Sequence, residues 1–180
     1  MQQNQRIILY VLILITGAAW ILISTDPTNA NGNAKSSAPQ AGFIAPDFTL
    51  NTPSGEPYNL SELKGRAILV NFWATWCPPC RAEMQTIEKI YLEYKVQGFI
   101  VLAINTTYQD DPFLIIPFTT GRNLTFPILL DETGEVANAY QLHSLPSSFF
   151  IDRTGKIRKV AIGGPMSEAL LRTRIEEILK

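Results

Sequence analysis

The sequence predicts an α/β domain with a central mixed β-sheet and helices on both faces, preceded by a transmembrane helix at the N-terminus. The apolar run at 67–74 is typical of a strand buried on both faces of a sheet. A helical pattern at 79–97 joins it to a second apolar run at 99–104, which gives a strand–helix–strand unit. A hairpin pattern at 147–162 and a last amphipathic helix complete one mixed sheet.

Residues 7–23 form an uncharged, mainly aliphatic run. A helix of this length, at ~1.5 Å per residue, nearly spans the hydrocarbon core of a bilayer. We therefore expect an uncleaved signal anchor that crosses the cell membrane once. Because Arg6 is the only charge before it, residues 1–6 are expected in the cytoplasm and the rest of the chain on the extracytoplasmic face, periplasmic or outer. The alternative is a cleaved signal peptide, with its cleavage site at Thr28-Asn29-Ala30.

Residues 24–42 are rich in small and polar residues without apolar periodicity, which is typical of a flexible linker. Residues 43–180 are sufficient for one domain with its own core. The formal net charge of the chain is −1, and no basic cluster indicates a nucleic-acid partner.

The first half of the domain contains short strands before its long helix. Triplets at 48–50 and 58–60, in which apolar residues flank a polar one, lie on either side of a Pro-Ser-Gly turn and predict a strand pair. Residues 61–65 form a helical turn that ends in glycine. In the helix at 79–97, which Gly98 ends, apolar residues recur at helical spacing: Met84, Ile87, Ile90, Tyr91 and Tyr94.

In the second half, Asp110-Asp111-Pro112 predicts a helix start with a cap and a proline at the first helical position. Pro117 is expected to kink or shorten this helix. The apolar run at 113–118 fits core packing, and the alternative is an exposed patch for docking a partner. Three short elements follow: a strand at 127–130, a turn at 131–134 and a helix at 136–140.

The end of the domain is a hairpin followed by a helix. Strands at 147–151 and 156–162 flank an Asp-Arg-Thr-Gly turn. Ser167 is the expected N-cap of the last helix. The residues of that helix expected to face inward are Leu170, Leu171, Ile175 and Ile178.

Cys77 and Cys80 are the only cysteines of the chain. They follow the strand at 67–74 and open the next helix, which is the layout of a thiol–disulfide exchange site. Two sulfurs on one helical turn can bond to each other in a small ring that opens easily, whereas a structural disulfide links distant segments. A structural zinc site is excluded because His143 is the only histidine, so four Cys or His ligands are lacking. No metal and no cofactor is expected.

These motifs resemble the thioredoxin superfamily, and more narrowly its membrane-anchored TlpA/ResA/CcmG-like thiol–disulfide oxidoreductases with a redoxin or AhpC-TSA-like domain. The resemblance covers residues 43–180. Its matching segments are Ala45-Pro46-Asp47-Phe48, Asn71-Phe72-Trp73-Ala74-Thr75-Trp76-Cys77-Pro78-Pro79-Cys80, Glu83, and Leu145-Pro146-Ser147-Ser148-Phe149-Phe150-Ile151-Asp152. It implies a thioredoxin-like fold, with Pro146 as a cis-proline that faces the disulfide and Leu145–Pro146 as a backbone with which an incoming polypeptide pairs. It also implies a carboxylate, Glu83, near the site.

On this basis Cys77 is the expected exposed nucleophile, because a helix N-terminus favours the thiolate. Cys80, which is more buried, then resolves the mixed disulfide and must lose a proton. Glu83 is the candidate base, because burial raises the pKa of a carboxyl group; the alternative is an ordinary exposed glutamate. Trp76 is expected at a rim that substrates touch, and Trp73 in the core.

Pro78 and Pro79 have no backbone N–H to offer the Cys77 thiolate. A less stabilised thiolate predicts a reductant rather than an oxidant. On the oxidising side of a membrane such a protein needs electrons. The resemblance implies a transmembrane thiol carrier of the CcdA/DsbD type as their source, and client protein disulfides, among them those of apocytochrome c, as their destination.

Two other functions compete with this interpretation. A thiol peroxidase of the peroxiredoxin class needs a threonine or serine three residues before its reactive cysteine, whereas Thr75 is two before Cys77. A copper-binding metallochaperone module uses two cysteines and a histidine, here His143. Its cysteines are separated by three residues, whereas two separate Cys77 from Cys80.

Overall fold

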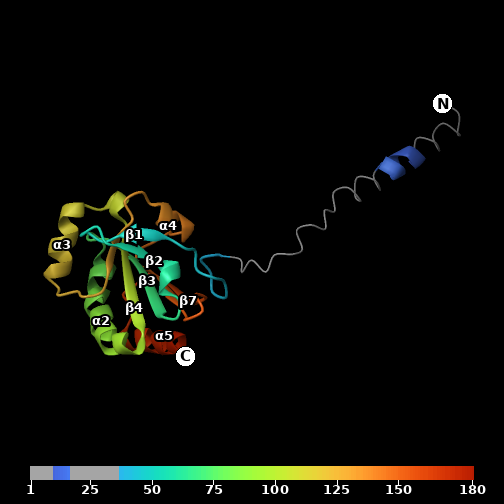
Figure 1. The fold of residues 1–180 in the computed structure, drawn as a ribbon. Coiled ribbons are helices and arrows are strands. Elements are labelled where there is room, and N and C mark those ends of the chain that lie inside the picture. The colour runs from blue at the N-terminus through green and yellow to red at the C-terminus, as the bar shows by residue number, and fades with distance from the viewer. Residues whose placement is uncertain (1–9, 17–36) are drawn as a thin grey trace. The chain divides into compact units, whose positions relative to one another are not determined.

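The computed structural model describes residues 10–16 and 37–180 (Figure 1). The chain divides into two units, residues 1–34 and 35–180, and each is described by itself. In the first unit, residues 10–16 are helical. Among the described residues, no helix has both the length and the apolar character needed to cross a membrane. Most of the expected anchor at 7–23 and of the expected linker at 24–42 lies outside the described residues, so both assignments stay predictions.

The second unit is built on one seven-stranded sheet with the strand order β2-β1-β5-β4-β3-β6-β7. The strands are β1 (Thr49–Asn51), β2 (Pro57–Asn59), β3 (Ala67–Trp73), β4 (Phe99–Asn105), β5 (Ile128–Leu130), β6 (Ser147–Ile151) and β7 (Ile157–Ile162). Strands β3, β4 and β5 are parallel, and the other neighbouring pairs are antiparallel. The predicted mixed sheet is therefore confirmed, and its two central strands, β3 and β4, are buried at every position.

Helices cover both faces of this sheet, as predicted. The helices are α2 (Pro78–Tyr94), α3 (Pro112–Thr120), α4 (Glu135–Ala139) and α5 (Glu168–Leu179), and three short 3₁₀ helices are η2 (Leu60–Leu63), η3 (Lys95–Gln97) and η4 (Thr107–Gln109). Side chains of α2, α3 and α5 share one core cluster, while α4 and η2 contribute to another. Because successive residues of a strand point to opposite faces, Leu69 belongs to the first cluster and Val70 to the second.

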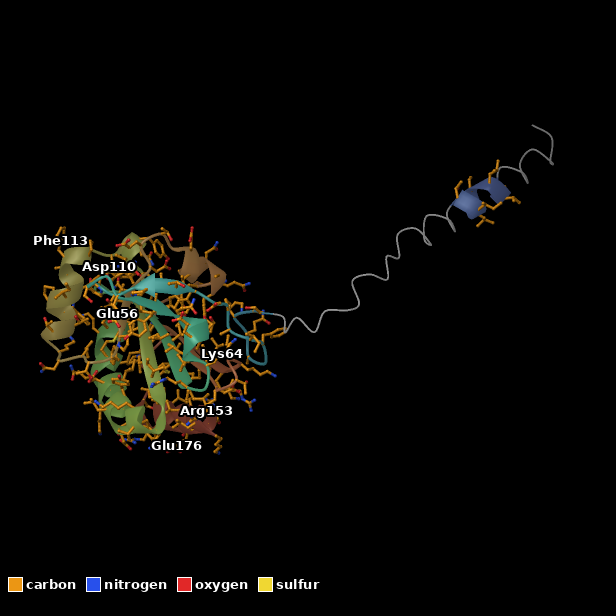
Figure 2. All side chains as sticks on the ribbon, viewed as in Figure 1. Glu56, Lys64, Asp110, Phe113, Arg153 and Glu176 are labelled. Carbon is orange, nitrogen blue, oxygen red and sulfur yellow. A yellow bond between two sulfur atoms is a disulfide. The ribbon has the colours of Figure 1, made fainter. Side chains whose placement is uncertain are left out.

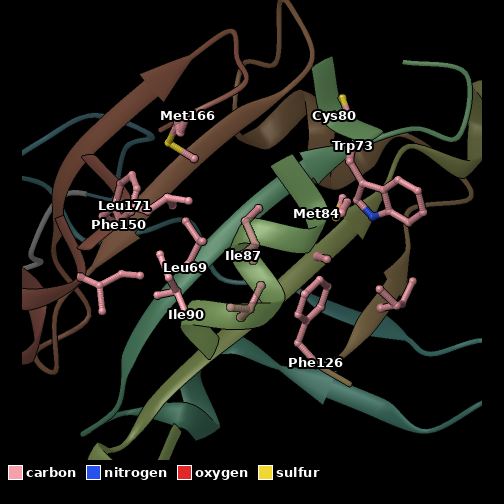
Figure 3. Close-up of a cluster of buried hydrophobic side chains, with 14 of the residues drawn as sticks. Leu69, Trp73, Cys80, Met84, Ile87, Ile90, Phe126, Phe150, Met166 and Leu171 are labelled. Atoms are coloured by element: carbon pink, nitrogen blue, oxygen red, sulfur yellow. The ribbon is translucent and has the colours of Figure 1, made fainter. Parts of the chain in front are cut away.

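The first core cluster packs against α2, the helix whose N-terminal end carries the cysteines. Figure 3 shows Met84 and Ile87 of α2 in this cluster together with Leu69 of β3 and Phe150 of β6. All four side chains are at most 1% exposed. Helix α2 is therefore fixed along its length against the two strands that flank the site.

The last helix differs from its prediction at one residue. Ser167 caps α5 through a hydrogen bond from the N–H of Leu170. Leu171, Ile175 and Ile178 are buried as expected, but Leu170 is 38% exposed. Leu170 lies one residue, about 100°, before the buried stripe and therefore points away from the sheet.

Pro117 does not end α3 early, so the expected shortening was wrong, while the expected kink stays a prediction. The helix continues through Thr120, and the N–H of Gly121 donates to the carbonyl of Pro117. A proline removes only one backbone donor, and the Thr119 hydroxyl donates to the carbonyl of Ile115 across the same turn. The last turn of α3 is thereby bonded to the turn that precedes it.

Candidate active site

Cys77 and Cys80 lie at the N-terminal end of α2, directly after β3, and are joined by a disulfide with Cα atoms 5.3 Å apart. Cys77 is the N-cap of α2, and its Sγ accepts a hydrogen bond from the N–H of Cys80 at 3.3 Å. Pro78 and Pro79 occupy the first two helical positions, where a helix accepts proline readily. The N–H of Cys80 is thus the earliest backbone donor that α2 offers to the Cys77 sulfur.

Both cysteines are buried in this disulfide form, with Cys77 3% and Cys80 0% exposed. The expectation that Cys77 is the exposed sulfur is therefore wrong for the oxidised state. Its Sγ is bonded to a fully buried partner and hydrogen-bonded to the first turn of α2, so it turns inward. Trp76, by contrast, is 54% exposed and donates from Nε1 to the carbonyl of Gln109, and its expected contact with substrates stays a prediction. Trp73 is buried in the core, as predicted.

Glu83 lies one turn after Cys80 on α2 and is fully buried, so the alternative of an exposed helix glutamate is wrong. Its Oε1 accepts from Asn71 Nδ2 at 2.9 Å, and its Oε2 accepts from the N–H of Met166 at 3.1 Å. Loss of hydration on burial raises the pKa of Glu83, and the hydrogen bonds from Met166 and Asn71 oppose this rise to a smaller extent. Glu83 is therefore easier to protonate than an ordinary glutamate.

Asn71 connects Glu83 to the neighbouring strand. It is fully buried on β3, and its Nδ2 also donates to Ser148 Oγ of β6 at 2.9 Å. Its Oδ1 has no hydrogen-bond partner among the described residues. The Asn71 Nδ2 group thus donates to Glu83, while the buried Oδ1 atom accepts no hydrogen bond from the described residues.

Leu145 and Pro146 precede β6 and are joined by a cis peptide bond, as the resemblance implied. Pro146 is buried, and Leu145 is half-buried against both core clusters. The carbonyl of Pro146 accepts from the N–H of Gly163 at 2.8 Å. A second cis peptide, Gly164–Pro165, follows in the same loop.

Gly164 separates Pro146 from Glu83. A Cβ atom at this position would lie 2.6 Å from Pro146 Cγ and 2.9 Å from Glu83 Oε2. Both distances are too short for real side-chain contacts, so only glycine lets the backbone pass between them. The Gly-Gly-Pro sequence could have indicated a turn here, but only the fold shows which groups it approaches.

Sequence analysis also missed the role of Asp110, which it assigned to a helix start. Asp111 is the N-cap of α3, whereas the Asp110 carboxylate accepts from the N–H and hydroxyl of Thr75 and from Asn105 Nδ2. Asp110 therefore fixes the loop that leads into Cys77. No local pattern distinguishes the two aspartates, because the contact of Asp110 with Thr75 spans 35 residues.

His143 is exposed in the loop after α4, where it lines a surface hollow with Tyr108 and Asn138. Within residues 10–16 and 37–180, no three His, Cys, Asp or Glu side chains are grouped so that they could hold a metal ion.

Replacing Gly164 with alanine is expected to destabilise the fold by about 1–3 kcal/mol, as overpacking does, and to slow disulfide exchange. The new methyl group must displace the Pro146 ring or the Glu83 carboxylate. Gly163→Ala is the matched control: its φ of +81° makes alanine strained there, but nothing lies within 4 Å of the new Cβ. Urea unfolding and exchange rates should show a stability loss in both variants and a slower rate only in Gly164→Ala; equal rates would contradict the contact.

Known proteins resemble this chain in both sequence and fold. The AhpC/TSA family matches residues 41–160. The thiol-disulfide oxidoreductase ResA of Geobacillus thermodenitrificans is 34% identical over 180 residues, which cover 99% of each chain. The thioredoxin-like protein YneN of Bacillus subtilis is 39% identical over 158 residues and 87% of each chain. Among solved structures, a thioredoxin family thiol:disulfide interchange protein of Chlorobium tepidum TLS has a TM-score of 0.70 and 29% identity, covering 76% of this chain and 96% of its own.

The resemblance inferred from the motifs is thus confirmed, and so is the thioredoxin-like fold. Two relatives that match 99% and 83% of this chain are named thiol-disulfide oxidoreductases, which is the chemistry that the Cys77–Cys80 disulfide supports. The chain belongs to the AhpC/TSA family and is a thiol–disulfide oxidoreductase of the ResA- and CcmG-like part of the thioredoxin superfamily.

Proposed function

We propose that this protein is a membrane-tethered, extracytoplasmic reductase of protein disulfides, such as those of apocytochrome c during cytochrome c maturation. The observation that carries the direction of the reaction is the first turn of α2. Cys77 Sγ accepts a hydrogen bond from the N–H of Cys80. Pro78 and Pro79, the two residues between the cysteines, have no N–H to donate. A thiolate with few donors makes the reduced form less stable and the protein a weaker oxidant.

The reaction uses the two thiols in turn. The Cys77 thiolate attacks one sulfur of the client disulfide, which breaks that bond, forms a mixed disulfide and releases the second client sulfur as a thiolate. Cys80 gives its proton to Glu83 and attacks Cys77 Sγ, so the client leaves with both of its sulfurs reduced. Two electrons pass to the client, and the Cys77–Cys80 disulfide remains. Glu83 returns its proton to solvent or to the departing thiolate.

The tether and the partners are part of the same proposal. The apolar run at 7–23 supports a single-pass anchor, and a domain outside the membrane needs an electron donor such as a thiol carrier of the CcdA/DsbD type. Labelling of intact cells with a membrane-impermeant maleimide tests the location. Modification of Cys77 after mild reduction is expected, and protection until the cells are lysed would contradict an extracytoplasmic domain.

The peroxidase alternative is not favoured. The Thr75 hydroxyl, which would have to bind peroxide, is already donated to the Asp110 carboxylate. The copper alternative has no more support, because His143 lines a hollow with Tyr108 and Asn138 in which neither cysteine takes part.

Equilibration with glutathione tests the proposed direction. We expect a reduction potential nearer to the approximately −270 mV of thioredoxin than to the approximately −120 mV of a strong oxidase. A value above that of protein disulfide isomerase, about −180 mV, would contradict a reductase.

Replacing Pro79 with alanine is expected to raise the potential and so make the protein a better oxidant. The change restores an N–H at the second helical position, which can donate to an N-cap side chain, here the Cys77 thiolate. A hydrogen bond to a charged group contributes about 1.5–3 kcal/mol. For a two-electron couple this corresponds to a rise of roughly 30–60 mV. Pro78→Ala is the control, because a first-position N–H does not serve the cap; an equal rise in both variants would contradict this account.

A further inference from the structure

Next to Trp76, the residue before Cys77, α3 presents an apolar surface that the core does not use. Four of its side chains, Phe113, Leu114, Ile116 and Pro117, are exposed, and their spacing places them on one side of the helix. Phe113 is 86% exposed, and Leu114 and Ile116 are each 52% exposed. We call these residues, together with Trp76, the α3 patch. Figure 2 labels Phe113 at the outer surface of α3.

Core packing does not account for the α3 patch. The opposite side of α3 supplies Ile115 and Phe118 to the core cluster under α2. The expectation of core packing for 113–118 thus holds for these two residues, while the outer residues leave apolar area in water. A single exposed apolar residue is ordinary, but a contiguous group of this kind marks a binding surface.

A hollow of about 370 Å³ lies between the α3 patch and the segment just before Cys77. It is lined by Thr75, Trp76, Arg81, Leu114, Pro117 and Phe118. Trp76 is the residue before Cys77, so a polypeptide with an apolar side chain in this hollow lies next to the segment that carries the reactive sulfur. The Arg81 guanidinium lies 5.7 Å from the Phe118 ring and adds a positive charge at the wall of the hollow.

Hydrogen bonds hold α3 at a fixed position relative to Cys77. Asp110, just before α3, accepts from the N–H and hydroxyl of Thr75. Trp76 Nε1 donates to the carbonyl of Gln109 at 3.0 Å. A ligand bound to α3 is therefore presented to the disulfide in one register.

We propose that the α3 patch binds a large apolar side chain that lies a few residues from the reactive cysteine of the client polypeptide. The inference rests on the proposed reduction of protein disulfides. Continuity with the redox site favours a polypeptide over a bilayer, because a bilayer resting on Trp76 would cover the sulfurs.

The test uses the full chain in lipid nanodiscs, reduced with dithiothreitol and then freed of it. The substrates are synthetic peptides with one intrachain disulfide in a serine background, in which a leucine is scanned through the four positions on each side of the cysteines. Stopped-flow tryptophan fluorescence gives the second-order rate constant. At one or two positions, leucine is expected to raise this constant about tenfold over the all-serine peptide, as for burial of one aliphatic side chain.

Phe113→Ser, Leu114→Ser and Ile116→Ser together should abolish this preference and leave the rate with glutathione disulfide, which is too small to reach α3, unchanged. Val96→Ser is the matched control: Val96 is 84% exposed but lies beyond the other end of α2, about 28 Å from Cys77 at ~1.5 Å per residue. It should keep the preference.

A flat leucine scan, or a preference that survives the triple substitution, overturns the inference even if glutathione disulfide is reduced. A triple variant that instead loses binding to lipid vesicles or self-association, with a flat scan in the unmodified protein, assigns the patch to a bilayer or to a second copy. If the unmodified protein reduces neither the peptides nor glutathione disulfide, the proposed function itself fails and the inference fails with it.

Discussion

Replacing Cys80 with serine is expected to lower multiple-turnover disulfide reduction on the order of 10⁴-fold, as for residues that act as one catalytic unit. Cys77 can still attack a client disulfide, but the fully buried position 80 then holds a hydroxyl that cannot resolve the mixed disulfide. The variant should therefore accumulate covalent adducts. Insulin turnover with dithiothreitol measures the loss, and non-reducing gels of native cells show the adducts.

Cys77→Ser is the control for this experiment. It should lose turnover equally but form no adduct, because the attacking sulfur is absent. Capture of a c-type apocytochrome by Cys80→Ser would support the maturation role, whereas a broad mixture of proteins would indicate a general reductase. Unchanged turnover in Cys80→Ser would contradict the two-thiol cycle.

Replacing Glu83 with glutamine is expected to slow the resolving step about 10²- to 10³-fold, within the range that positioned acid–base groups contribute. Glutamine fills the same buried space but cannot take the proton of Cys80. Attack by Cys77 on a client should keep its rate. Stopped-flow measurement of mixed-disulfide decay against pH separates the two steps.

Glu88 provides a matched control on the same helix. It is a buried carboxylate that accepts from the N–H and hydroxyl of Thr125, away from the cysteines. Glu88→Gln should lower stability through these lost bonds and leave the decay of the mixed disulfide unchanged. Equal slowing in both variants would mean that general destabilisation, rather than proton transfer, explains the effect of Glu83→Gln.

The raised pKa of Glu83 also makes the free energy of unfolding depend on pH. Its pKa in the folded state is higher than the unfolded value of about 4.5, so the folded protein binds the proton more tightly. This contribution is complete below the unfolded pKa and is lost as the pH rises through the folded pKa. Glu83→Gln removes this loss. The stability difference between the two proteins, measured by urea unfolding from pH 4 upward, should therefore shift in favour of the variant as the pH rises.

Patterns that depend on neighbouring residues predicted most of the fold. The uniform apolar run of β3 has to be buried on both sides, and Gly98, with φ +85°, ends the helical segment that follows α2 as a glycine in the left-handed region does. The expected shortening of α3 at Pro117 was wrong because a rule for single residues ignores the hydrogen bonds of the surrounding turn. The expected burial of Leu170 was wrong because a shift of one position along a helix turns a side chain by about 100°, which is beyond the edge of the buried stripe.

The candidate site was predictable only in part. The spacing of Cys77 and Cys80 is local, so the sequence indicated their chemistry. The environment of Glu83 depends on Asn71 and on the backbone of Met166, which are 12 and 83 residues away. Contacts over such distances are set by strand order and loop paths, and no periodicity in the chain records them.

The amide of Asn71 gives Glu83 a neighbour that suits both of its charge states. With the carboxylate ionised, Nδ2 donates to it, as observed. With Glu83 protonated, the remaining carbonyl oxygen can still accept from Nδ2, which also stays bonded to Ser148 Oγ. An aspartate at position 71 would offer only acceptors and would repel the ionised form. A proton can therefore be taken up and released inside this core with the Asn71 amide and the sheet in place.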